Sequence, residues 1–345
     1  MKEPGGFLLE NIRSQPATIE ALLGDWAPAQ AAAERLSTAA RIFVVGTGTS
    51  FHGALVGQHL CRSAGRDAWA VPAFEFSQYP PRLRPNDGLV LLSHRGTKRF
   101  SRASLDLAAA AGGNWIAITG KGSPLEGAGV LQTVPQETSP VITVSHLGAM
   151  LRLAQLAATA APPPSWLDAL PNLPSMVRAA VDTEPTCVEI AQSIDLDRTL
   201  FFVGGGPAWA NALEGALKVR EAAYVSTIGY QVEEILHGPM VSVDAKDTVV
   251  IIAEPGPSLA RAQDVAGGLQ AIGTQIVALG SAAPSIPGAR WTLQMSALPE
   301  VLAPLVNVIP LQWLAYQLSL RAGADADSFR TNEEPYALAR ERVEL

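Results

Sequence analysis

Cysteine is scarce in this chain, because Cys61 and Cys187 are the only two among 345 residues. Both stand in apolar stretches with helical spacing, so we expect neither a disulfide framework nor a cysteine-based metal site. Long uncharged apolar runs are missing as well. The longest candidate, residues 301–320, contains two prolines as well as Asn and Gln, so no membrane span is expected.

Clustered positive charge is also absent. The net charge is −7 and the 25 Lys and Arg residues are scattered, which argues against nucleic acid as a partner. The start, MKEPGGFLLENI, lacks a basic segment followed by an apolar one, so no signal peptide is expected. With 48% hydrophobic and 17% charged residues, the composition is that of a well-packed globular protein. A cytoplasmic location is the expectation.

Six short apolar runs alternate with Ala-rich helical stretches, as buried parallel strands alternate with helices. They occupy residues 41–46, 88–93, 114–119, 199–204, 248–253 and 274–280. The first three runs end at residues 46, 93 and 119, which are 47 and 26 residues apart. The last three end at 204, 253 and 280, which are 49 and 27 residues apart. Glu137 and Glu300 then each precede a long apolar helix. The matching intervals indicate an internal duplication.

The duplication predicts an α/β fold with two tandem, doubly wound parallel-sheet domains of the flavodoxin-like kind. A Pro- and Ala-rich segment, residues 157–174, indicates a linker between them. The expected parts are a helical N-terminal segment (1–35), a first domain (36–160), a linker with a helix (161–194), a second domain (195–322) and a C-terminal tail (323–345).

The turns after the first-domain strands are rich in hydroxyl groups and positive charge. They read GTGTS and SHRGTK, and a third polar segment, TVSH at 143–146, precedes another helix. The corresponding second-domain turns, GGGPAW and AEPGPSL, have lost nearly all of these groups. Hydroxyls and free N–H groups at helix N-termini bind anions, and such turns lie at the carboxyl ends of strands in an open α/β sheet.

We therefore predict that the first domain holds a phosphate monoester. Ordinary helix capping is the alternative for any single turn, and no G-x-G-x-x-G dinucleotide motif is present. The predicted phosphate- and sugar-binding residues are Thr49, Ser50, Ser93, Arg95, Thr97, Lys98, Thr143 and Ser145.

Three charged residues interrupt the apolar stretch 210–224. On a helix, Glu214, Lys218 and Glu221 fall within an arc of about 60°. One interpretation is a solvated face with ion pairs. Because the flanking residues are Ala, Leu, Val and Tyr, we favour a face that lines a cavity. A carboxylate and an amine held together have perturbed pKa values, which suits proton transfer.

A histidine follows in EEILHGP. His237 stands before Gly238 and Pro239, which place it at a loop or helix end, and Glu233 and Glu234 offer it a carboxylate partner. A lone histidine is more often structural, yet this one is a candidate acid or base. The residues alone indicate a sugar phosphate held by the first domain and proton-transfer groups supplied by the second.

These motifs resemble the tandem sugar-isomerase (SIS) domain family, in particular the isomerase half of glucosamine-6-phosphate synthase and the stand-alone amino-sugar-phosphate deaminases and isomerases. The most specific motif is ALEGALKxxE…Y…E-x-x-HGP at 212–239. GTS at 48–50, EF at 75–76 and L-Q-x-LAY at 311–316 also match. The resemblance covers residues from about 20 to 340. No glutamine amidotransferase domain is found, so this chain is not expected to make ammonia from glutamine.

The resemblance implies roles for individual residues. Glu221 resembles the base that moves a proton between C1 and C2, Lys218 its neighbouring acid or base, and His237 the ring-opening residue. In the family that histidine comes from the other subunit, which implies a homodimer. The remaining residues with implied supporting roles are Glu137, Glu214, Glu234 and Arg330.

Two positions depart from the family pattern. The second phosphate loop usually reads S-x-S-G-x-[ST], and here Arg95 and Lys98 replace the second serine and the final hydroxyl. Charge can replace a hydroxyl as a phosphate ligand. The tail lysine of the family aligns with Arg340, whose high pKa puts a Schiff base at that position in doubt. Arg330 remains to fold the tail over the sugar.

Two classes of function follow. The chain is either an aldose–ketose isomerase or deaminase of a sugar 6-phosphate such as glucosamine 6-phosphate, or a non-catalytic sugar-phosphate sensor. A synthase that receives ammonia from a separate subunit is a third, weaker possibility. No cofactor and no metal are expected, because the five histidines share no ligand spacing and this proton transfer needs no Lewis acid.

Overall fold

The computed structural model describes residues 3–160 and 162–343. The outermost residues of the predicted terminal segments, and the first residue of the predicted linker, lie outside these ranges. The described chain forms two compact units, each with one sheet. The first unit comprises 15–137, 142–174 and the chain from Ala339, and the second comprises the chain up to Ser14, 138–141 and 175–338.

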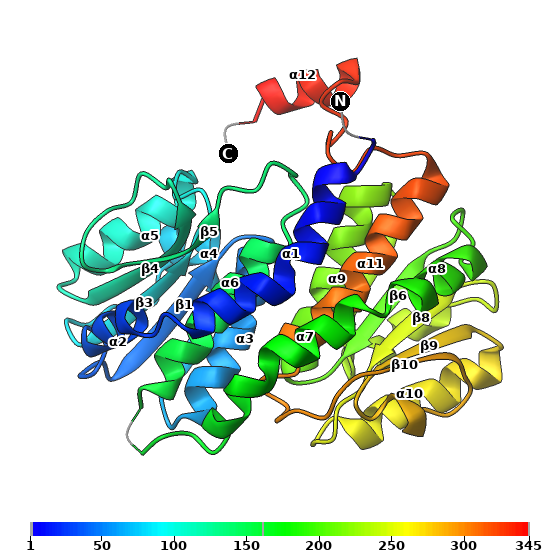
Figure 1. Cartoon of the computed structure of the whole chain (residues 1–345), viewed down its shortest axis with the longest axis horizontal. Coiled ribbons are helices and arrows are strands. Elements are labelled where there is room, and N and C mark those ends of the chain that lie inside the picture. The colour runs from blue at the N-terminus through cyan, green and yellow to red at the C-terminus, as the bar shows by residue number, and fades with distance from the viewer. Residues whose placement is uncertain (1–2, 161, 344–345) are drawn as a thin grey trace. The chain divides into compact units, whose positions relative to one another are not determined.

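The first unit contains a parallel sheet with the strand order β2-β1-β3-β4-β5, which is the flavodoxin-like order. Four of its strands, β1, β3, β4 and β5, are labelled in Figure 1. Its strands are β1 (Arg41–Gly46), β2 (Ala68–Pro72), β3 (Asp87–Leu92), β4 (Asn114–Lys121) and β5 (Val130–Pro135). The helices in this part of the chain, as far as residue 158, are α1 (Gly6–Leu23), α2 (Ala27–Glu34), α3 (Thr49–Ser63), α4 (Ala73–Gln78), α5 (Arg99–Ala110) and α6 (Val144–Ala158).

Alternate residues of β1 face opposite helix layers, as the two-residue period of a strand requires. Phe43 and Val45 belong to the apolar cluster beneath α4 and α5. Val44 faces the other layer, where a Cβ on Gly57 of α3 would touch both Val44 and Leu153 of α6. Because β1 and β3 run parallel, the helices that follow them, α3 and α5, both begin at the carboxyl edge of the sheet.

The second unit repeats this arrangement with the order β10-β9-β8-β6-β7. Its strands are β6 (Leu200–Gly204), β7 (Thr227–Gln231), β8 (Thr248–Ile252), β9 (Gln275–Gly280) and β10 (Ala289–Gln294). The remaining helices are η1 (Leu167–Asn172), α7 (Leu173–Val181), α8 (Glu184–Ser193), α9 (Pro207–Ala223), η2 (Glu234–Leu236), η3 (Pro239–Ser242), α10 (Leu259–Ile272), η4 (Ala283–Ser285), α11 (Pro304–Ala322) and α12 (Glu334–Glu341).

The duplication extends to backbone detail. Gly48 precedes α3 with φ +56° and ψ −128°, and Gly206 precedes α9 with φ +55° and ψ −131°. The predicted fold of two doubly wound α/β domains is confirmed, whereas the exact domain boundaries stay a prediction. Within the described ranges, no helix is both long and apolar enough to cross a bilayer.

Candidate functional site

The first predicted anion turn lies where β1 passes into α3. Gly46 allows the helix to begin close to the strand, because a Cβ there would lie 2.4 Å from the backbone of Ser50. Gly48 adopts a conformation that other residues reach only with strain. Thr49 and Ser50 are the first residues of α3 and are half-buried. The turn is therefore a helix N-terminus at the carboxyl edge of the sheet.

The second predicted turn lies next to it, since β1 and β3 are parallel neighbours. Ser93 follows β3 and is buried, and Thr97 is exposed. Gly96 has φ +70°, and a Cβ there would lie 2.1 Å from Ser123 Oγ. Backbone freedom and space therefore both require glycine at this point of the loop.

Positive charge gathers at this loop. Arg95 is exposed and Lys98 is half-buried just before α5, and in the described part of the chain neither side chain has an ion-pair partner. Burial lowers the pKa of Lys98, and the charges of Arg95 and Arg340 lower it further. An anion bound here would relieve this repulsion.

The third predicted segment is tied down by Glu137. The Glu137 carboxylate accepts hydrogen bonds from the backbone N–H groups of Thr143 (3.1 Å) and Ser145 (2.8 Å) at the start of α6. The Thr143 hydroxyl lies 3.3 Å from the same carboxylate, and Ser145 Oγ lies 3.1 Å from His94 Nε2. These backbone donors are occupied by the chain itself. Their role as phosphate ligands stays a prediction.

The corresponding edge of the second unit has the opposite chemistry. Pro207 stands at the first position of α9, and Pro255 and Pro257 lie in the loop after β8. Proline lacks the N–H that an anion needs. Two carboxylates, Glu254 and Glu300, face this edge, where burial raises the pKa of Glu300 and the charge of Glu254 raises it further. An anion therefore suits the first unit and not the second.

Helix α9 carries the charged stripe. It packs closely on β6, because a Cβ on Gly215 would lie 2.9 Å from the Phe202 ring. Glu214 and Lys218 are buried, with Lys218 Nζ 3.5 Å from Glu214 Oε1. Lys218 also donates a hydrogen bond to Glu221 Oε2, whose side chain is 22% exposed. The three residues share one face of α9 and form the ion pairs of the solvated interpretation, but Glu214 and Lys218 are buried and not solvated. That this face lines a cavity stays a prediction.

The predicted histidine lies on the surface of the second unit. His237 follows η2 and is 66% exposed, and its Nε2 lies 2.7 Å from Glu233 Oε1. Arg261 donates to the same carboxylate from Nε (2.5 Å) and Nη2 (2.9 Å). Hydrogen bonds from Arg261 and then His237 lower the pKa of Glu233 to about 2. Glu233 thus holds the imidazole, whereas Glu234 is exposed and contacts Gln231 through its backbone N–H.

Arg330 holds the C-terminal tail to the end of α9. Its guanidinium forms two hydrogen bonds to Glu333 (2.9 and 2.7 Å). It lies 3.7 Å from the centre of the Tyr336 ring and 5.1 Å from that of Tyr224. The Tyr224 hydroxyl donates to the carbonyl of Asp325 (3.1 Å). In this conformation the Arg330 side chain therefore binds residues of the tail and Tyr224. A contact between Arg330 and the sugar stays a prediction.

Sequence reasoning missed the parts of this chemistry that depend on the fold. Arg261 lies on α10, far along the chain from Glu233, and no local motif connects the two. His94 was noted only as one residue of the loop Ser93–Lys98, which we call the anion loop. Its ring nevertheless joins that loop to α6. The contact of Arg261 with Glu233 and that of His94 with α6 can be recognised only when the strand order is known, because the order brings these segments together.

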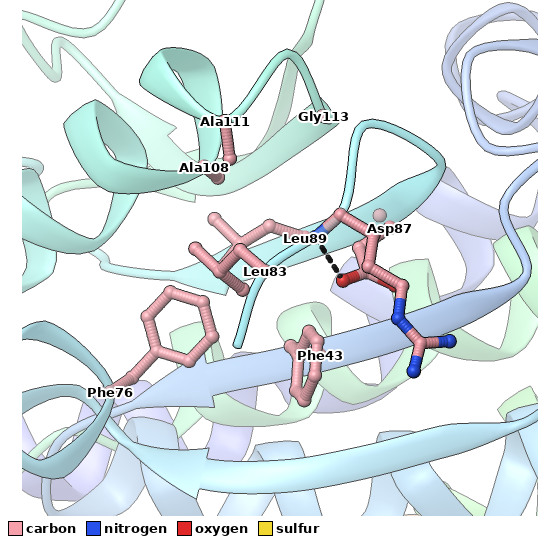
Figure 2. A pocket seen from close by; sticks show the side chains of 10 residues that line it. Phe43, Phe76, Leu83, Asp87, Leu89, Ala108, Ala111 and Gly113 are labelled. Carbon is pink, nitrogen blue, oxygen red and sulfur yellow. Dashed lines mark hydrogen bonds between the residues drawn. The ribbon is translucent and has the colours of Figure 1, made fainter. Parts of the chain in front are cut away.

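A small apolar hollow in the first unit lies elsewhere. Figure 2 shows it beside β1 and β3, lined by Phe43, Phe76 and Leu89 among others. Asp87 at its rim accepts a hydrogen bond from the Arg84 backbone N–H (2.8 Å). Asp87 begins β3, so the hollow lies at the amino end of the strand. It is not part of the candidate site, which lies at the carboxyl ends.

The two thiols are also outside the candidate chemistry. Burial raises the pKa of Cys61 to about 11 and that of Cys187 to about 12. Both remain protonated near neutral pH, and the thiol form is a poor nucleophile.

Comparisons with known proteins concern the family and the fold. A family model described as SIS domain matches residues 35–160 and 194–322. A glutamine–fructose-6-phosphate aminotransferase (isomerizing) from Methanothermobacter thermautotrophicus is 29% identical over 337 residues, which cover 95% of this chain and 57% of that protein. This chain therefore spans little more than half of that relative.

Two solved structures share the fold. The C-terminal domain of glucosamine-fructose-6-phosphate aminotransferase from Francisella tularensis has a TM-score of 0.84 at 20% identity, covering 93% of this chain and 98% of that one. A glucosamine-6-phosphate deaminase from Thermotoga maritima has a TM-score of 0.75 at 20% identity, covering 93% and 97%. At these identities the likeness shows the fold alone.

Proposed function

The chain belongs to the SIS domain family, and on that premise we propose that it is an aldose–ketose isomerase or deaminase of a sugar 6-phosphate such as glucosamine 6-phosphate. One observation carries the proposal. Lys218 is buried between two carboxylates, and one of these, Glu221, is within reach of solvent. A buried ammonium with an accessible carboxylate beside it is equipped to take up and return a proton.

The proposed chemistry acts on the open-chain sugar. Glu221 removes the proton from C2 of glucosamine 6-phosphate and returns it to C1 through an enolamine. This step converts the C1 aldehyde with its C2 amine into a C1 alcohol with a C2 imine. Water then hydrolyses the imine to fructose 6-phosphate and ammonia. Lys218 donates the proton that the C1 oxygen gains as the enolamine forms, and it takes a proton back from the C2 nitrogen as the imine forms. The carboxylate of Glu214 stabilises its ammonium form.

The phosphate is assigned to the first unit. Thr49 and Ser50 begin a helix beside the Ser93–Lys98 loop, where Arg95 and Lys98 add positive charge. The three prolines and two carboxylates at the matching edge of the second unit support this choice, because they remove donors and repel anions. Charge-assisted hydrogen bonds from Arg95 and Lys98 take the place of hydroxyl donors.

His237 is proposed to act in a homodimer. It is exposed and is oriented by Glu233, which is itself fixed by Arg261. An oriented, exposed imidazole suits action on a sugar bound by a second copy of the chain, where it would open the ring. Ultracentrifugation of the wild-type protein and a His237→Ala variant tests the assembly apart from the activity.

The experiment is an assay of Glu221→Gln. The wild-type protein is incubated with glucosamine 6-phosphate, and fructose 6-phosphate and ammonia are measured. Loss of the acid–base group is expected to lower the rate about 10²–10⁴-fold, whereas Glu189→Gln on the surface of α8 leaves it unchanged. Tight binding of a sugar phosphate with no turnover, unaffected by Glu221→Gln, would favour the sensor instead.

A further inference from the structure

His94 gathers hydrogen bonds from three other segments. Its carbonyl accepts from the backbone N–H of Gly120 (2.9 Å) and from Gln136 Nε2 (2.9 Å). Its ring Nε2 accepts from the backbone N–H of Glu137 (3.3 Å) and lies 3.1 Å from Ser145 Oγ. His94, the second residue of the anion loop, is thereby bonded to the end of β4, to the segment after β5 and to the first turn of α6.

These contacts fix the tautomer of the ring. A backbone N–H can only donate, so Nε2 carries the lone pair and the neutral ring carries its proton on Nδ1. Burial lowers the pKa of His94 to about 4, with Arg95 adding to the effect, so the ring is neutral near pH 7. Nδ1 is buried and, within the described ranges, has no hydrogen-bond partner. The bonds at Nε2 therefore determine how the ring is oriented.

Gly120 makes the space that the ring occupies. A Cβ on Gly120 would lie 2.4 Å from His94 Cε1 and 2.5 Å from Nδ1. The φ of Gly120 lies outside the left-handed region, so the requirement is for space and not for backbone freedom. The imidazole is thus confined between the β4 backbone on one side and Glu137 on the other.

The second unit repeats the same contact with a different group. Glu254 follows β8 as His94 follows β3, and a Cβ on Gly280 would lie 2.6 Å from Glu254 Oε1. The carboxylate accepts from the Ser281 backbone N–H (3.1 Å) and from Asn307 Nδ2 (2.7 Å) on the first turn of α11. In each unit, the side chain two residues after the strand thus accepts hydrogen bonds that hold this loop. A carboxylate would repel an anion at the first unit's loop, and a neutral imidazole does not.

We propose that His94 is the positioning residue of the anion loop: wedged between Gly120 and Glu137, it holds Ser93, Arg95 and the loop backbone in the anion-binding conformation. This rests on the proposed function only in that the loop binds the substrate's phosphate. When the anchor is lost, the loop samples other conformations, and the apparent dissociation constant rises by the inverse of the fraction that remains competent.

The test compares two ways of removing the anchor and one way of keeping it. His94→Ala deletes the acceptor, and Gly120→Ala displaces the ring without changing a polar group. His94→Gln supplies an amide oxygen that can accept the same bonds. His59→Ala, a half-buried histidine on α3, and Gly267→Ala, where a Cβ meets open space, are the matched controls. Thermal unfolding without ligand shows that each variant is folded.

Inorganic phosphate is the probe, and its affinity is measured by calorimetry at pH 7.5. We expect the dissociation constant to rise about tenfold in His94→Ala and Gly120→Ala, to stay within about threefold of wild type in His94→Gln, and to be unchanged in both controls. With substrate, KM should rise at constant kcat, because uniform binding is what is lost. Nitrogen NMR should find the Nδ1–H tautomer.

Three results would overturn the proposal: wild-type affinity in His94→Ala and Gly120→Ala, a His94→Gln variant as weak as His94→Ala, or an Nε2–H tautomer. If the loop is not the phosphate site, the wild-type protein binds no phosphate, and this inference falls with that assignment. If the wild-type protein binds phosphate but converts no sugar phosphate, the isomerase function fails alone and the positioning role is still tested by the variants. A wild-type protein that binds phosphate while the His94 variants bind it equally well refutes the positioning role alone.

Discussion

Lys218 and Glu214 lie one turn apart on α9, each with a side chain about 1% exposed, and 3.5 Å separates the ammonium from the carboxylate. Glu221 shares the ammonium from the other side. Removing the ammonium leaves the buried carboxylate of Glu214 without its oppositely charged neighbour, which is far more unfavourable than the intact pair is favourable. The same contacts that suit proton transfer should therefore also be important for stability.

The first prediction is that Lys218→Met destabilises the second unit strongly. It leaves Glu214 buried without its ammonium, which should lower the free energy of unfolding by about 3–5 kcal/mol. Glu214→Gln combined with Lys218→Met should recover part of the loss, because position 214 then no longer buries a negative charge. Urea unfolding measures both, with exposed Lys246→Met as the control. A Lys218→Met variant as stable as Lys246→Met would contradict the prediction.

The predicted strands show what hydrophobic runs can reveal. All six runs became strands, and β1 occupies the predicted residues 41–46. Four strands were not predicted. They are the two edge strands of each sheet: β2 and β5 in the first unit, and β7 and β10 in the second. Their burial is mixed, as in β10, where exposed and half-buried residues alternate over most of the strand. A strand covered on only part of its surface has no continuous apolar run to recognise.

The candidate site was predictable where the signal is local. Helical spacing placed Glu214, Lys218 and Glu221 on one face, because α9 is continuous. For the carboxylate partner of His237, the sequence offered Glu233 and Glu234 but could not distinguish them. Glu233 is held in place by Arg261 from α10. Contacts of that kind come from strand order, which sequence spacing does not contain.

A second prediction concerns charge at the anion loop. Arg95→Ser and Lys98→Thr each remove a cation that has no protein partner in the described ranges. A hydrogen bond to a charged group contributes about 1.5–3 kcal/mol, so phosphate affinity should fall about 10- to 100-fold in each variant. The dependence of affinity on salt should also become shallower.

Calorimetry at several ionic strengths measures both effects. Arg102→Ser, an exposed arginine farther along α5, serves as the control for loss of net charge. Unchanged phosphate binding in Arg95→Ser and Lys98→Thr would remove these two residues from the site.

A third prediction is a dependence of stability on pH. Asp87 is buried and pairs with Arg41 at 2.6 Å. Burial alone would raise its pKa, but hydrogen bonds from Arg41 and from the Arg84 backbone outweigh it and hold the pKa below its usual value. A lowered folded pKa means that Asp87 stabilises the unit above about pH 4, the unfolded value, and that this stability is lost as the pH falls through the folded value.

Denaturant unfolding at pH 7 and pH 3 measures the effect. Asp87→Asn should be less stable than wild type by about 1–3 kcal/mol at pH 7, and its stability should fall less between the two pH values. Exposed Asp106→Asn should follow the wild type. Equal pH dependence in all three proteins would show that Asp87 is not a source of acid sensitivity.

The last prediction concerns the tail. Tyr224, Phe329 and Arg330 have φ of 60°, 49° and 54°, a left-handed conformation that is unfavourable by about 1–2 kcal/mol for each non-glycine residue. The Arg330 fork to Glu333 and its stacking on Tyr336 offset this strain. Lysine keeps the charge but has neither the planar fork nor the stacking face.

Arg330→Lys should therefore release the segment from 325 onward while α9 stays folded. Limited proteolysis with mass spectrometry should find faster cleavage in this segment, and Tyr224→Phe should show a smaller effect in the same direction, because it loses one hydrogen bond to Asp325. Arg342→Lys, an exposed arginine in the same tail, controls for the substitution itself. Equal cleavage in Arg330→Lys and Arg342→Lys would mean that the left-handed residues are held by something other than this guanidinium.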